Sequence, residues 1–107
     1  IRPELLRRIA ENSLREEEDG RWGFKFDPRW FGVPSRPAPN LSEIRTRVLL
    51  MRGDQSDLLS PTGADELLNE LAEAALVTIP GAGHHIHLDQ PERTLVALLE
   101  FLDPDSR

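Results

Sequence analysis

Two short apolar runs and two amphipathic stretches alternate along the second half of the chain. The runs Arg47–Arg52 and Leu76–Ile79 lack the alternation of a half-exposed strand, which predicts strands buried on both faces, as in a parallel sheet. Apolar residues at helical spacing predict one helix from Pro61, after Ser60 as N-cap, and a last helix from Pro91 to about Leu102. The stripe of the first of these helices consists of Ala64, Leu67, Leu68, Leu71 and Ala75. The order strand, helix, strand, helix predicts an α/β fold with a right-handed βαβα unit.

The first part of the chain has a different pattern. Residues from Pro3 to about Arg15 carry their apolar side chains on one broad face, which predicts a helix. Trp22, Phe24 and Phe26 then alternate with polar or small residues, which indicates an extended segment with an aromatic face. The prolines between Pro34 and Pro39 predict an irregular connector. We therefore expect two parts, residues 1–40 and residues 41–107.

Composition narrows the functional classes. The chain has 107 residues and a net charge of −6, with 19 acidic and 13 basic side chains. This balance argues against nucleic acid and against an anionic membrane surface as partners. No apolar run approaches the roughly 20 residues of a membrane-spanning helix. The absence of cysteine excludes a disulfide framework and is compatible with the cytoplasmic location that we expect.

Candidate chemistry lies in the two loops that follow the predicted strands. Asp57 lies in the first loop and His84 in the second, and both loops should meet at one edge of a parallel sheet. A carboxylate that bonds one imidazole nitrogen fixes the tautomer and stabilises the imidazolium, and the other nitrogen then acts as a general base. The pattern thus suits an Asp–His dyad.

Three motifs in order resemble the C-terminal part of an α/β-hydrolase-fold enzyme. The first is the loop Arg52–Pro61, the second is Ile79–His84 with its Gly-x-Gly-His sequence, and the third is the helix start Leu88–Glu92. The similarity covers Thr46 to about Leu102, and Pro3–Asn40 more loosely resembles the end of the cap region of such enzymes.

The resemblance implies a Ser-Asp-His triad in which His84 is the base and Asp57 the orienting carboxylate. It also implies hydrolysis of an ester or a similar small apolar substrate, without a metal or an organic cofactor. No serine of the chain stands in a Gly-x-Ser-x-Gly elbow. We therefore expect the nucleophile outside this chain, which begins with Ile1 and reads as a fragment. Either the missing N-terminal half of the hydrolase or a second copy of the chain would cover the open sheet edge, and the chain alone should be inactive.

Several alternatives stay open. Asp54 lies in the same loop as Asp57 and competes with it as triad acid, although the family's register favours Asp57. His85 and His87 compete with His84 for the role of the base because they lie next to it. The three histidines together are a weaker candidate for a zinc site, since they lack the usual spacing of zinc ligands.

The role of the aromatic face is equally open. Trp22, Phe24 and Phe26 suit a substrate-binding wall or a small satellite core. The class of the protein also has an alternative, a non-catalytic interaction or ligand-binding module that uses a hydrolase-like domain.

Overall fold

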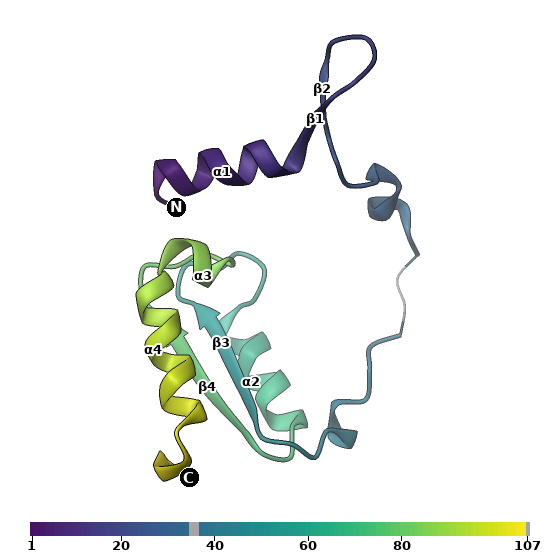
Figure 1. Ribbon diagram of the computed structural model, residues 1–107. Helices are drawn as coiled ribbons and strands as arrows, with labels where there is room; N and C mark the ends of the chain where they lie inside the picture. Colours follow the sequence, from purple (N-terminus) through teal and green to yellow (C-terminus); the bar gives the residue numbers. More distant parts are fainter. Residues whose placement is uncertain (35–36, 107) are drawn as a thin grey trace. The chain divides into compact units, whose positions relative to one another are not determined.

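The computed structural model describes residues 1–34 and 37–106, in two compact units, Ile1–Ala38 and Pro39–Arg107 (Figure 1). Ser35 and Arg36, which belong to the predicted connector, lie outside the described residues.

The first unit consists of a helix, a small hairpin and a short turn of 3₁₀ helix. Helix α1 (Pro3–Ser13) runs directly into strand β1 (Leu14–Glu16), which pairs antiparallel with β2 (Trp22–Phe24). Gly20 turns the chain between the two strands with φ +78°, a conformation that glycine adopts without a Cβ clash. The 3₁₀ turn Pro28–Gly32 follows, and the Asp27 side chain caps it by accepting a hydrogen bond from the backbone of Arg29.

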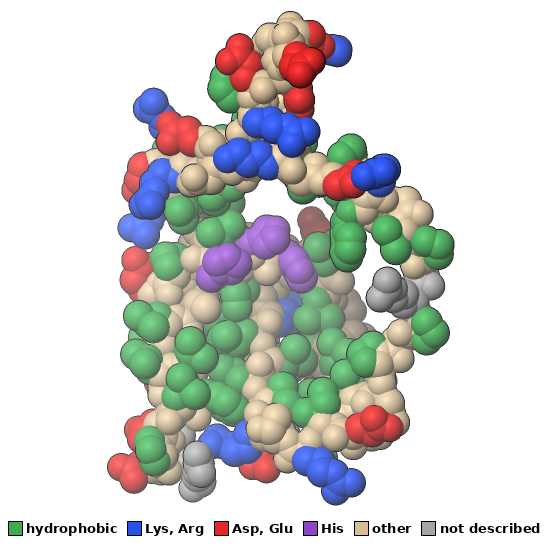
Figure 2. Space-filling view, turned by 45° about the vertical axis from the view of Figure 1, so that its right-hand side comes forward, with side chains coloured by type: hydrophobic (Ala, Val, Ile, Leu, Met, Phe, Trp, Pro, Cys, Tyr) green, Lys and Arg blue, Asp and Glu red, His purple; other side chains and the backbone are tan. Residues whose placement is uncertain are grey.

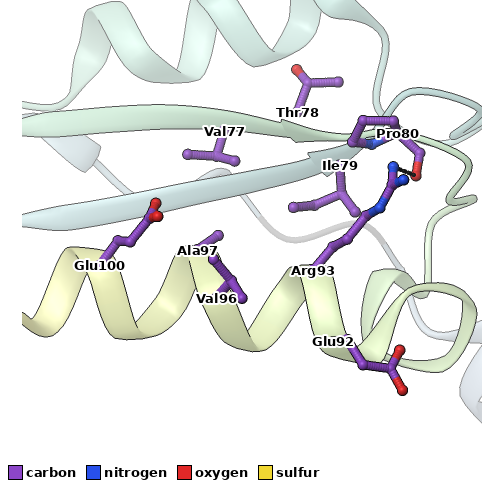
Figure 3. A pocket seen from close by; sticks show the side chains of 9 residues that line it. All are labelled: Val77, Thr78, Ile79, Pro80, Glu92, Arg93, Val96, Ala97 and Glu100. Carbon is purple, nitrogen blue, oxygen red and sulfur yellow. Dashed lines mark hydrogen bonds between the residues drawn. The ribbon is translucent and has the colours of Figure 1, made fainter.

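The second unit is a two-stranded parallel sheet covered by helices. Strands β3 (Val48–Gly53) and β4 (Ala74–Ile79) pair in register from Val48 opposite Ala74 to Gly53 opposite Ile79. Helix α2 (Pro61–Glu70) connects them, and helices α3 (Ile86–Asp89) and α4 (Pro91–Leu102) follow β4. Figure 3 shows α2 and α4 on opposite sides of the strands, as a parallel strand pair buried on both faces requires.

The predicted βαβα unit is confirmed, and most helix starts fall at the predicted residues. Ser60 caps α2 by accepting a hydrogen bond from the Gly63 backbone at 3.0 Å. The end of α2 differs from the prediction, because the helix ends at Glu70 and Ala75 lies inside β4. Helical and extended periods overlap in an alanine-rich stretch such as residues 72–75, so the stripe alone does not separate them.

The buried core of the second unit is small. Ile79, Ala82 and Ala97 form one cluster, against which half-buried side chains such as Met51 and Ile86 pack, and Ala64 of α2 is buried as well. By contrast, α4 leaves several large apolar side chains exposed, namely Leu95, Val96, Leu98, Leu99 and Leu102. Within residues 1–34 and 37–106, no helix combines the length and the apolar composition that crossing a membrane requires.

Candidate active site

The loops after β3 and β4 lie against one another, because backbone hydrogen bonds continue past the ends of the strands. The Asp54 N–H donates to the Ile79 carbonyl oxygen at 3.1 Å, and the Gln55 N–H donates to the Ala82 carbonyl oxygen at 2.9 Å. The expectation that the acid loop and the histidine loop share one edge of the sheet is therefore confirmed.

The Asp54 carboxylate bonds the backbone of the histidine loop. Its Oδ1 accepts hydrogen bonds from the Gly81 N–H at 2.9 Å and from the Ala82 N–H at 3.3 Å. A carboxylate that accepts backbone N–H groups makes charge-assisted bonds, which are stronger than bonds between neutral groups. One side chain of the acid loop thus connects to two consecutive residues that lead to His84.

Side chains that follow the histidine loop hold its remaining backbone groups. Asp89 Oδ2 accepts the Gly83 N–H at 2.9 Å, and Gln90 Nε2 donates to the Gly81 carbonyl oxygen at 3.2 Å. Arg93 Nη1 donates to the Pro80 carbonyl oxygen at 3.3 Å, as Figure 3 shows. Gln90 thus stands at the N-cap position of α4, while the Asp89 carboxylate bonds the histidine loop.

Gly53 permits the close approach of the two loops. A Cβ atom at this position would clash with the backbone carbonyl oxygens of Ala82 and Gly83, which have no flexible end that can move away. Gly81 has a different role, since its φ of +71° lies in the left-handed region, where side chains are strained.

Arg52 holds the acid loop from inside the domain. Its side chain is buried, and Nε donates to the Leu59 carbonyl oxygen at 2.7 Å while Nη2 reaches the Asp54 carbonyl oxygen at 3.5 Å. The guanidinium therefore joins the first and the last part of the loop that carries Asp57. A buried charge requires such partners, because an unpaired one is costly.

His84 is exposed and faces the acid loop. Its Nδ1 lies 3.4 Å from Ser56 Oγ, whose oxygen also accepts the N–H groups of Leu58 at 3.3 Å and Leu59 at 3.2 Å. Which of the two atoms donates depends on the tautomer of the imidazole. The imidazole thus meets the acid loop one residue before Asp57.

The remaining candidate residues are Asp57 and the two histidines that follow His84 in the chain. Asp57 is exposed, and its carboxylate makes no hydrogen bond or ion pair with the residues that the structure describes. The Asp57–His84 contact therefore remains a prediction. The rings of His84 and His85 are 5.5 Å apart, and those of His85 and His87 are 6.2 Å apart, so the three histidines gather on the surface (Figure 2). In the described part of the chain, no group of three or more histidines or carboxylates is placed to hold a metal ion.

The aromatic residues of the first unit form a cluster of a different composition from the predicted face. Phe24 and Phe26 stack with centroids 4.9 Å apart, and Phe31 meets Phe26 edge-on at 5.7 Å. Phe26, Asp27, Trp30 and Phe31 line a cavity of about 480 Å³. Trp22 is 67% exposed and takes part in none of these ring contacts. The turn that begins at Asp27-Pro28 is the sequence signal that could have indicated the return of Phe31.

A second groove, of about 440 Å³, lies between β4 and α4 (Figure 3). Its floor includes Val77, Ile79 and Ala97, and charged side chains of α4, such as Glu92 and Arg93, stand at its rim.

Comparison with known proteins identifies the class. The chain matches the Alpha/beta hydrolase family over residues 2–98. The 2-(acetamidomethylene)succinate hydrolase of Mesorhizobium japonicum is 31% identical over 72 residues, which cover 67% of this chain and 26% of that protein. Esterase YbfF of Escherichia coli is 26% identical over 96 residues, which cover 89% of this chain and 38% of that protein.

Solved structures agree on the fold. A marine microorganism esterase superposes with a TM-score of 0.63 and 25% identity, over 94% of this chain and 41% of that one. Esterase Rv0045c of Mycobacterium tuberculosis superposes with a TM-score of 0.69 over 92% of this chain and 34% of that one, and at 19% identity it shows the fold alone. The chain belongs to the α/β hydrolase family and contains part of its fold, as the motifs predicted. It spans about a quarter to two fifths of the length of these relatives.

Replacing Gly53 by alanine should separate the two loops. The added methyl group would meet two backbone carbonyls, and overpacking of this kind typically costs about 1–3 kcal/mol of unfolding free energy. Chemical denaturation of the complete protein measures the change. Gly32→Ala is the matched control, because a Cβ there meets no atom within 4 Å. Equal stability of the two variants would contradict the close approach.

Asp89 should titrate below the ordinary range of an aspartate. The Gly83 N–H that donates to its carboxylate lowers the pKa of Asp89. A lowered pKa in the folded state means that the bond stabilises the loop above pH of about 3.9, and that this stabilisation is lost as the pH falls through the folded-state pKa. An NMR titration should give the Asp89 carboxyl and the Gly83 amide one shared midpoint below about 3.9. Asp89→Asn should abolish the amide's response, and a midpoint at or above the ordinary value would refute the assignment.

Proposed function

We propose that this chain supplies Asp57 and His84 to a Ser-Asp-His triad of a hydrolase that acts on an ester or a similar small apolar substrate. The observation that carries the proposal is the 3.4 Å approach of His84 Nδ1 to Ser56 Oγ in the acid loop, next to Asp57. The relatives named as esterases support an ester as the bond that is cleaved. The serine nucleophile and the oxyanion hole would come from a segment outside this chain.

The proposed roles follow from the chemistry of the two side chains. The Asp57 carboxylate would accept a hydrogen bond from the Nδ1–H of His84, at the nitrogen that now faces the Ser56 hydroxyl. His84 Nε2 would take the proton of the serine hydroxyl as that oxygen attacks the ester carbonyl carbon. It would return the proton to the departing alcohol, and water would then release the acid and regenerate the serine in the same way.

The aromatic cluster of the first unit suits recognition of an apolar group. Phe26, Trp30 and Phe31 present exposed rings around a cavity of about 480 Å³, within the size range of small-molecule sites. We assign the substrate-binding role to this cluster together with Phe24, whereas the exposed Trp22 contributes at its margin.

The exposed apolar side chains of α4 and the unpaired edge of β3 in the described sheet need a cover. We assign this cover to the N-terminal half of the hydrolase, with a second copy of the chain as the alternative. The same exposed surface favours a second candidate function, a non-catalytic interaction module. A stable, monomeric isolated chain in a sizing experiment would count against both covers.

Substitution of His84 should abolish turnover of an activated ester such as p-nitrophenyl butyrate. His84→Ala and Asp57→Asn, made in the complete protein, should each lower kcat by about 10³- to 10⁴-fold or more, since the base or its correct tautomer is lost. His87→Ala is the matched control and should keep most of the activity.

Two outcomes would refute the proposal. One is full activity of the His84→Ala protein. The other is turnover by the isolated chain that His84→Ala abolishes, because the nucleophile would then lie within the chain.

A further inference from the structure

The acid loop and the histidine loop are joined chiefly through one pair of consecutive residues. The Asp54 N–H donates to the Ile79 carbonyl oxygen, and the Asp54 carboxylate accepts the N–H groups of Gly81 and Ala82. The Gln55 N–H donates to the Ala82 carbonyl oxygen. Four hydrogen bonds therefore join two residues of one loop to the strand end and turn of the other.

This connection lies between the two proposed catalytic side chains. Asp57 follows Asp54 by three residues, and His84 follows Ala82 by two, so neither catalytic residue is far along the chain from the joined backbone. Gly53 permits the approach, and Arg52 fixes the carbonyl of Asp54 from inside the domain. A shift of Asp54 would therefore change the distance between the two loops that carry the dyad.

We propose that Asp54 is a positioning residue that sets the distance between His84 and Asp57 by holding the Gly81–Ala82 turn. The proposal rests on the proposed function only for its effect on turnover. Holding the turn requires an acceptor oxygen at the Oδ1 position of residue 54 and not a negative charge, because both partners of this oxygen are backbone N–H groups. A displacement of about 1 Å in a catalytic group can lower a rate by about 10²-fold.

This role differs from that of a triad acid in a way that one pair of substitutions resolves. An asparagine at position 54 keeps a carbonyl oxygen that can accept the two N–H groups, whereas an alanine removes it. A triad acid, by contrast, loses about 10⁴-fold in kcat when it becomes asparagine, because the histidine then adopts the wrong tautomer.

The experiment measures kcat, KM and amide hydrogen exchange in the complete protein that contains this chain, with Asp54→Ala, Asp54→Asn and the control Asp65→Ala on the exposed surface of α2. Asp54→Ala should lower kcat about 10- to 100-fold with little change in KM and should speed exchange at Gly81 and Ala82. Asp54→Asn should stay within about 10-fold of the unsubstituted protein, and Asp65→Ala should change nothing.

Two results would overturn the proposal. One is unchanged exchange at Gly81 and Ala82 in Asp54→Ala. The other is a loss in Asp54→Asn as large as that in Asp54→Ala, and a loss near 10⁴-fold in both would make Asp54 the triad acid. If the complete protein hydrolyses no ester, the proposed function fails, and the exchange measurement alone still decides whether Asp54 holds the turn.

Discussion

Two consecutive backbone N–H groups in the turn after β4 require acceptors, and a single carboxylate oxygen of Asp54 serves both. The turn is partly exposed and glycine-rich, so the chain by itself favours many conformations there. Bonds from Asp54, Gln55, Asp89 and Gln90 select one of them. The placement of His84 depends on this selection, because its imidazole begins one residue after the last of the bonded amides.

The parallel sheet and helices α1, α2 and α4 were predictable because their signals are local and repeated. Val48–Gly53 is apolar without alternation, and α4 begins at Pro91 with an apolar stripe that continues to Leu102. The end of α2 was not predictable, since Ala74 and Ala75 favour a helix by propensity and pairing with β3 overrides that preference. The family and the partial fold followed from three motifs in order, which is a stronger signal than any one of them.

The contacts of the site were harder to predict because they join residues far apart in the chain. A sequence shows that Asp54 and Asp57 share a loop, but not which carboxylate meets the backbone of another loop. The same limit applies to the aromatic cluster. Phe24 and Phe26 stack as their period of two suggests, whereas Phe31 joins them only through the turn capped by Asp27. Trp22 takes part in neither of these ring contacts.

The two loop aspartates occupy different chemical environments. The Asp54 oxygen already accepts two N–H groups that cannot ionise or leave, so its position is tied to the backbone. Asp57 has no such bonds among the described residues and remains able to turn toward an imidazole. Asp54 holds the turn through Oδ1, one of the two oxygens of its carboxylate. Arg52 bonds the carbonyl oxygens of Asp54 and Leu59, which flank Asp57 in the chain. The loop that holds the turn is thus itself held from inside the domain on both sides of Asp57.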